Sequence, residues 1–276
     1  MHKSLKLKLL LLGVPAAAGF AVFYICPFIK SIGYSFIESN FSSRFVWLDN
    51  YKTVLANEFF RLALKNTVMF SAVGVATVVL LALLLSLGLV KLSEKYSLIK
   101  SAFILPYVLP SASIIFIWQM IFSSDVYSSL IGALSSKDLF DVLPLYLIFI
   151  WKNIGIDIIL ITAALSKLPP QIYEAAALDG ASGLKMHFKI TLPLISPSLF
   201  FVTVLSFVNS LKIFKESYLF YNSNYPPDAA YMIQNFMNNN FYKLNYQNLS
   251  TAVTMFTVVV AIIIFVIYRL VNRVSE

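Results

Sequence analysis

The sequence predicts an all-α integral membrane protein with six transmembrane helices. The chain has 276 residues, of which 59% are hydrophobic and 12% are charged, whereas an average soluble domain is about half apolar and about a quarter charged. A soluble monomer could not cover so much apolar surface. In addition, six apolar stretches have about the 20 residues that a helix needs to cross the hydrocarbon core. These predicted spans lie at roughly 9–29, 67–90, 99–122, 143–165, 194–220 and 250–268.

The first span has an alternative interpretation as a cleaved signal peptide. Basic residues precede it, and Ala16-Ala17-Ala18 resembles a cleavage site. The apolar run continues to Ile25, however, and is long enough to cross the membrane, so we predict a retained first helix. The chain has one cysteine, Cys26, which can form neither an internal disulfide nor a zinc site built from cysteines. We expect it to be a small buried apolar side chain.

The regions flanking the second span carry two local signals. Before it, residues 50–64 place apolar side chains at helical spacing, which predicts an amphipathic helix in the outer interface. After it, Pro106 and Pro110 lie within the third span and predict a kink there. The second and sixth spans are uniformly apolar, whereas the fourth and fifth contain charges.

The distribution of basic residues predicts that both termini face the cytoplasm. Six spans place the two ends on one side, and Lys and Arg are enriched in cytoplasmic loops. With the termini inside, the inner segments hold eleven Lys and Arg in about 54 residues, against seven in about 84 residues outside. The formal charge of +8 is therefore mostly an orientation signal. No basic patch with interleaved aromatic residues is present, so nucleic acid is not an expected partner.

The longest predicted inner segment, 166–193, is too polar to span the membrane and too regular to be a linker. Residues 171–179 form a strongly helix-favouring run with three alanines. Gly180 then lies where a helix can end in a left-handed residue. A second short helix is predicted at 183–190, and Pro193 is expected to stop it before the fifth span.

This segment resembles the EAA signature of binding-protein-dependent (ABC) importer permeases. Glu174-Ala175-Ala176, Gly180 and Ile190-Thr191-Leu192-Pro193 meet every fixed position and every spacing of that signature. The resemblance implies a cytoplasmic coupling helix that docks on a separate ATPase, with Glu174, Ala175, Ala176, Asp179 and Gly180 as the coupling residues. The residue types suit this role, because alanines permit close approach and Glu174 complements the helix dipole. The alternative is a plain amphipathic helix on the membrane surface.

The resemblance extends over essentially the whole chain and is to the sugar type of these permeases, which includes maltose and glycerol-phosphate transporters. Leu48-Asp49-Asn50-Tyr51, Asn66-Thr67, Trp151, Gly155 and Tyr173 carry it, and the short C-terminal tail is similar to the F type of maltose-transporter subunit. The family implies a second permease subunit, a cytoplasmic ATPase dimer and a periplasmic or extracellular solute-binding protein. It also implies a multi-pass protein of the bacterial cytoplasmic membrane.

The sequence contains no motif that would make this chain an enzyme. Gly180, Gly183 and Lys185 do not form a phosphate loop, which needs four residues between its glycines and a Lys-Ser/Thr pair after them. His2 and His187 are isolated, so no metal site is expected. We therefore expect this chain to bind no cofactor itself, with ATP and Mg²⁺ on the partner ATPase.

The fourth and fifth spans contain polar and charged residues, which are costly in lipid and normally face a bundle interior or a wet cavity. Aromatic faces with hydrogen-bonding groups suit a sugar, so we predict a path for the solute along these spans. In the alternative interpretation Lys152 and Lys215 extend to the outer interface, and Lys212 pairs with Glu216. The candidate residues of the path are Trp151, Asn153, Asp157, Ser206, Asn209, Ser210 and Lys212.

Two other functions compete with a sugar importer subunit. A self-sufficient secondary transporter predicts an internal repeat with paired interrupted helices, and no convincing repeat is present. An importer of a phosphorylated, acidic or other non-sugar solute stays open, because Lys152 and Lys212 could contact an anion. A membrane enzyme or scaffold is not favoured, since no catalytic constellation is readable.

Overall fold

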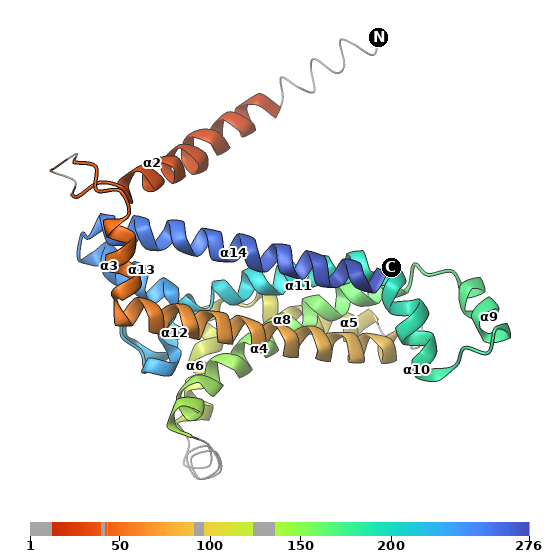
Figure 1. The fold of residues 1–276 in the computed structure, drawn as a ribbon. Coiled ribbons are helices and arrows are strands. Elements are labelled where there is room, and N and C mark those ends of the chain that lie inside the picture. Colours follow the sequence, from red (N-terminus) through yellow and green to blue (C-terminus); the bar gives the residue numbers. More distant parts are fainter. Residues whose placement is uncertain (1–12, 40–41, 43, 91–96, 124–135, 276) are drawn as a thin grey trace. The chain divides into compact units, whose positions relative to one another are not determined.

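The computed structural model describes residues 13–39, 42, 44–90, 97–123 and 136–275, and these residues are almost entirely helical (Figure 1). Within them no strand is present beyond an isolated bridge between Ile37 and Phe45. The all-α prediction is therefore confirmed for the described chain. Its helices are α2 (Cys26–Tyr34, preceded by the π-helical turn Ala21–Ile25), α3 (Asp49–Ala56), α4 (Glu58–Leu89), α5 (Ser97–Val108), α6 (Ser111–Phe122), α8 (Lys137–Leu165), α9 (Pro170–Leu178), α10 (Gly183–Met186), α11 (Leu192–Leu211), α12 (Phe214–Tyr221), α13 (Ile233–Tyr242) and α14 (Tyr246–Ser275).

Five helices in the described residues are long and apolar enough to cross a membrane, and a bent pair would make a sixth. The chain divides into two compact units. The first comprises the residues up to Arg61 with Phe236–Val260, and the second comprises Leu62–Asn235 with the residues from Ala261 onward. The five helices are Gly13–Tyr34, Glu58–Leu89, Lys137–Leu165, Gly183–Tyr221 and Tyr246–Leu270, and the bent pair is Ala102–Val108 with Ser111–Phe122.

In the first unit, polar side chains organise the turn between α2 and α3. The Asn50 amide donates to the carbonyl oxygens of Ser35 and Ile37 at 3.0 and 2.8 Å. Asn57 is extended and its side chain accepts from the Phe60 N–H at 3.1 Å, which caps α4. The single helix predicted over 50–64 is therefore wrong, because this cap ends α3 and starts α4. Cys26 is exposed rather than buried, since the described part of its helix buries no side chain.

The core of the second unit is an apolar seam between α4, α8 and α11. Its buried residues include Ala82, Ile158, Ile161 and Val202. Helix α5 packs so closely on α8 that a Cβ at Gly155 would overlap the carbonyl oxygen of Phe103. This seam fixes the helices that carry the polar residues of the fourth and fifth spans.

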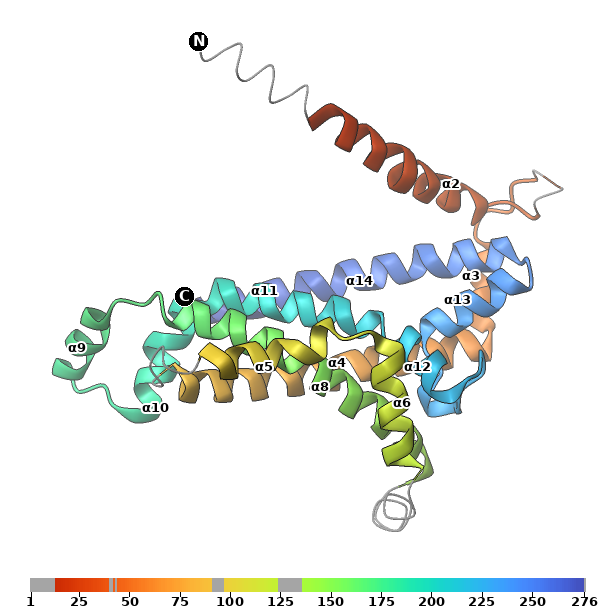
Figure 2. The ribbon, with the colours of Figure 1, turned by 180° about the vertical axis from the view of Figure 1, so that it is seen from behind.

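The predicted third span is two helices that meet at 102°, and Figure 2 shows the bend between α5 and α6. Pro106 lies inside α5, and Pro110 stands at the N-cap of α6. The predicted kink is confirmed, and the stretch predicted over 99–122 is a bent pair of helices that would together make one span. A proline just before a helix ends the preceding helix, because it disfavours helical backbone in the residue ahead of it. The start of α6 therefore faces the interior instead of continuing α5.

The helix that contains the predicted fifth span begins earlier than that span. Helix runs from Gly183 to Tyr221 through α10, a π-helical turn at His187–Thr191, α11 and α12. Pro193 does not stop this run but occupies the first turn of α11. The π-helical turn just before it changes the hydrogen-bond register, and proline is tolerated where its missing N–H is not needed.

Two residues of the resemblance, Asn66 and Thr67, anchor a loop of the second unit. The Asn66 amide donates to the carbonyl oxygens of Asp228 and Tyr231 at 2.6 and 3.0 Å. Thr67 accepts from the N–H of Ile233 at 2.8 Å. These bonds satisfy backbone groups where the chain is not in a long helix, so they hold the segment after α12 against α4.

Candidate solute cavity and coupling loop

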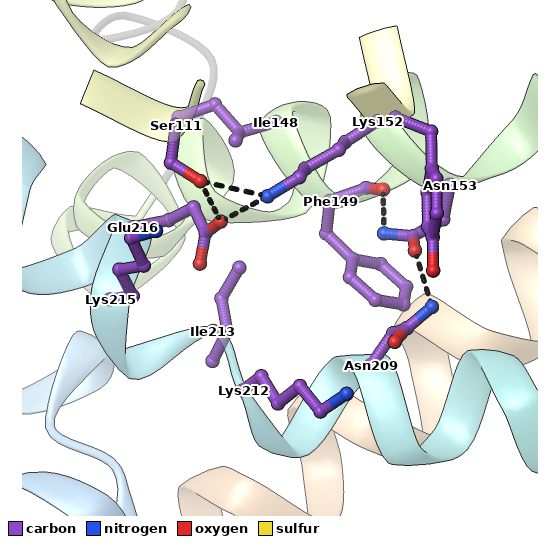
Figure 3. Close-up of a pocket in the computed structure, with 11 residues that line it drawn as sticks. Ser111, Ile148, Phe149, Lys152, Asn153, Asn209, Lys212, Ile213, Lys215 and Glu216 are labelled. Carbon is purple, nitrogen blue, oxygen red and sulfur yellow. Dashed lines mark hydrogen bonds and ion pairs between the residues drawn. The ribbon is translucent and has the colours of Figure 1, made fainter. Parts of the chain in front are cut away.

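A polar cavity of about 370 Å³ lies where α5, α6, α8, α11 and α12 meet. All of these helices belong to the second unit. In the otherwise apolar bundle, such a concentration of amide and charged groups is unusual, because each costs free energy in lipid. Figure 3 shows the residues that line it, namely Tyr107, Ser111, Ile148, Phe149, Lys152, Asn153, Asn209, Lys212, Ile213, Lys215 and Glu216.

A charged triad joins three helices at one wall of the cavity. The Lys152 ammonium group lies 2.6 Å from the Glu216 carboxylate and 2.9 Å from the Ser111 hydroxyl oxygen. The Ser111 hydroxyl donates to the same carboxylate oxygen at 3.1 Å. Since Glu216 is 6% exposed, the carboxylate depends on these partners for its charge to be tolerated. The triad therefore links α6, α8 and α12.

An amide pair forms a second wall, between α8 and α11. Asn209 donates from Nδ2 to the side-chain oxygen of Asn153 at 2.9 Å. Asn153 donates in turn to the Phe149 carbonyl at 2.8 Å, which fixes its orientation (Figure 3). Asn209 Oδ1 has no hydrogen bond within the described part of the chain, so it is available as an acceptor at the cavity.

The 166–193 segment forms the predicted helix and glycine turn. Helix α9 starts at Pro170, and Gly180 has a φ of 78°, which confirms the left-handed turn. The N–H groups of Gly180 and Ala181 donate to the carbonyls of Ala177 and Ala176 at 3.0 and 2.9 Å. This pair of bonds is a Schellman motif. Figures 1 and 2 show α9 and α10 at one end of the second unit and α6 and α12 at the other.

The coupling candidates differ in their exposure. Glu174, Ala175 and Asp179 are exposed, whereas Ala176 is 7% exposed and is turned inward. Leu178 is 91% exposed.

Residues 79–275 match the family of binding-protein-dependent transport system inner membrane components. The chain belongs to this family. The permease is 27% identical over 268 residues to the arabinooligosaccharides transport system permease AraP of Bacillus subtilis, which covers 92% of the chain and 84% of that protein. It is 29% identical over 212 residues to the sn-glycerol-3-phosphate transport system permease UgpA of Yersinia pestis, covering 72% of the chain and 71% of that protein.

A solved structure has the same fold as the permease. It is a bacterial alginate ABC transporter in complex with an alginate pentasaccharide-bound periplasmic protein, and its matching chain aligns with a TM-score of 0.75 and 22% identity over 100% of this chain and 98% of that one. The resemblance to importer permeases is therefore confirmed. The permease is a multi-pass protein of the bacterial cytoplasmic membrane, and its family is one of membrane permeases rather than enzymes.

The cavity brings together three of the seven predicted path residues, which are Asn153, Asn209 and Lys212. Trp151 lies outside it, 38% exposed, with its ring edge-on to Trp118 at 5.9 Å between centroids. The indole therefore belongs to an aromatic pair with α6 rather than to the cavity.

Asp157, Ser206 and Ser210 are buried in contacts between helices. The Ser206 hydroxyl donates to the Asp157 carboxylate at 2.6 Å, and both residues are fully buried. Ser210 donates to the Ser71 hydroxyl of α4 at 2.8 Å. The structure thus places these three residues outside the cavity lining, because the side of α11 that carries the serines packs against α8 and α4.

The pairing of the lysines differs from the alternative interpretation of these charges. Glu216 pairs with Lys152, not with Lys212, and Lys152 points into the cavity instead of extending to the interface. The reason is a break between α11 and α12 at Lys212 and Ile213, which ends the continuous helical face. Ser111 was not predicted at all. The sequence feature that could have indicated Ser111 is Pro110, because this proline caps the new helix that begins at Ser111.

Proposed function

We propose that this permease is a transmembrane subunit of an ABC importer for a sugar or oligosaccharide, and that the 370 Å³ cavity is part of its translocation path. The observation that carries the proposal is the cavity itself, where an amide pair and a charged triad meet inside an apolar bundle. Fixed polar groups of this kind can replace the hydration of a sugar. The arabinooligosaccharide permease from Bacillus subtilis supports the sugar class.

The proposal includes partners that supply energy and specificity. A second permease subunit completes the path, and a cytoplasmic ATPase dimer carries ATP and Mg²⁺, so that this chain binds no cofactor. A periplasmic or extracellular binding protein delivers the solute, as the periplasmic protein in the related alginate transporter complex suggests. Residues 1–276 act as a single permease domain, which is embedded in the lipid membrane.

We expect both termini and the 166–193 segment to face the cytoplasm. The bias of Lys and Arg supports this orientation. Helix α9 lies at the end of the second unit opposite α12 (Figure 1), so the two ends should be labelled from different sides of the membrane. In a Cys26→Ser background, which removes the exposed native thiol, Ser182→Cys should react with an impermeant maleimide only in inside-out vesicles. Asn224→Cys should react in intact cells. Labelling of Ser182→Cys from outside intact cells would contradict this orientation.

We propose that α9 docks on the ATPase and that Gly180 sets its angle. Gly180 adopts a backbone conformation that a β-branched residue avoids. Gly180→Val should therefore leave the complex hydrolysing ATP without matching uptake, by about tenfold or more in the ratio of uptake to hydrolysis. Glu174→Ala should weaken docking. Both rates are measured in proteoliposomes that contain the complete importer.

Gly180→Asn provides the matched control for this experiment. Asparagine tolerates the left-handed conformation far better than valine, so the asparagine variant should retain most of its coupling. If Gly180→Val and Gly180→Asn transport alike and at the parental rate, the turn does not couple hydrolysis to uptake. That result would also remove the main support for α9 as the docking element.

A further inference from the structure

The cavity carries an excess of positive charge after its internal ion pair is counted. Three lysines and one glutamate line it. Lys152 and Glu216 neutralise each other at 2.6 Å. Lys212 and Lys215 are exposed, and neither has an acidic partner within the described residues. The cavity therefore offers two uncompensated cationic groups to whatever enters it.

We propose that the solute carries an anionic group and that Lys212 and Lys215 bind it. This inference rests on the proposed function, in which the cavity is part of the path. The two lysines flank the break between α11 and α12, where the Lys215 N–H donates to the Lys212 carbonyl at 3.3 Å. Both side chains line the same cavity, so each can offer a cationic group to an anion bound there.

The remaining lining defines what the anion is attached to. The Lys212 side chain extends toward Asn209, whose side-chain oxygen can accept from a hydroxyl group (Figure 3). Tyr107 adds an aromatic ring to the same cavity. Lysine is a common ligand for carboxylates and phosphates, while amides and aromatic rings suit a polyhydroxylated ring. The chemistry therefore fits a sugar or polyol with a carboxylate or a phosphate, rather than a neutral sugar.

The triad explains why Lys152 is not a third anion ligand. Its ammonium group already contacts the Glu216 carboxylate and the Ser111 hydroxyl. Freeing it would leave a nearly buried carboxylate without its counter-charge, which is strongly unfavourable. Specificity for the anion is thus assigned to the two lysines at the helix break, and the triad supports the wall beside them.

Uptake by the complete importer in proteoliposomes tests the inference with three probes, a neutral arabinotriose, trigalacturonate and sn-glycerol 3-phosphate. Lys212→Gln and Lys215→Gln should each lower kcat/KM for the anionic probes by about tenfold, as expected for the loss of one charge-assisted bond. The neutral probe should be taken up less well than the anionic ones, and its uptake should be the same in both lysine variants as in the parent. Lys212→Arg should retain uptake, and KM for the anionic probes should rise with ionic strength.

Two further variants separate the inference from the proposed function. Asn209→Ala should lower uptake of every transported probe by a few fold, because it removes a polar group of the path itself. Lys137→Gln, an exposed lysine at the start of α8 that does not line the cavity, should change nothing. The anionic probe whose uptake depends on the two lysines shows whether the cavity prefers a carboxylate or a phosphate.

The outcomes are distinct. Uptake of the neutral probe alone, sensitive to Asn209→Ala and insensitive to both lysine variants, would overturn the inference and leave the proposed function standing. Uptake of an anionic probe that ignores the lysine variants would also overturn the inference. Uptake of glycerol phosphate but of neither sugar, with dependence on both lysines, would uphold the anion site while it removes the sugar class. Absence of uptake of all three probes would contradict both.

Discussion

Replacing Gly155 with alanine is expected to separate α5 from α8 and to destabilise the permease severely. A Cβ at this position would overlap the carbonyl oxygen of Phe103, which is a backbone atom of α5. A flexible side chain could rotate away, but the backbone of a helix can only move as a unit. Overpacking of a core usually costs about 1–3 kcal/mol and sometimes more, and a clash with backbone lies at the upper end.

The thermal unfolding midpoint of the purified protein measures this effect, and the chain supplies a matched control. A Cβ at Gly88 in α4 would have nothing within 4 Å, so alanine there meets open space. Alanine favours a helix over glycine by about 1 kcal/mol, and Gly88→Ala should therefore keep or raise the midpoint. Gly74→Ala should be intermediate, because its Cβ would lie 3.2 Å from side-chain atoms of Phe149 and would not meet backbone. Equal midpoints for Gly155→Ala and Gly88→Ala would show that α5 does not pack as described.

Much of the fold could be predicted from the sequence because membrane helices leave a strong local signal. The length of an apolar run is set by the hydrocarbon core, so most spans are readable from composition alone. The turn at Gly180 could also be predicted from a short stretch of sequence, because it depends on a single left-handed residue after a helix. The family resemblance followed from residues within that same turn and its neighbouring helices.

The candidate site was harder to predict because it depends on how helices face each other. A continuous helix would let Lys212 pair with Glu216, but the break after Leu211 rotates the residues beyond it. Ser206 and Ser210 share the polarity of Asn209, yet they satisfy buried contacts with Asp157 and Ser71. Nothing in the order of residues distinguishes a hydroxyl that binds a partner helix from one that faces a cavity.

Removing either partner of the Lys152–Glu216 pair should destabilise the permease more than removing both. Glu216 is nearly buried and contacts Lys152 at 2.6 Å, so Lys152→Met leaves a carboxylate without its counter-charge. Breaking a buried pair in this way costs about 3–5 kcal/mol. The Lys152 side chain keeps some access to the cavity, with 21% of it exposed, so we expect the lower end of this range. Glu216→Leu alone should cost a similar amount, because it strands the ammonium group.

The double variant Lys152→Met with Glu216→Leu distinguishes an ion pair from two independent contacts. Replacing a buried ion pair by apolar residues of similar volume is often neutral, so the double variant should recover most of the stability lost in each single variant. The thermal unfolding midpoints of the parent, the two single variants and the double variant together form a double-mutant cycle. Lys212→Met serves as the control, since this cavity lysine has no acidic partner in the described chain and its loss should barely change the midpoint. If the stability lost in the double variant equals the sum of the losses in the two single variants, the triad does not hold α6, α8 and α12 together through charge. Its role at the cavity wall would then rest on packing alone.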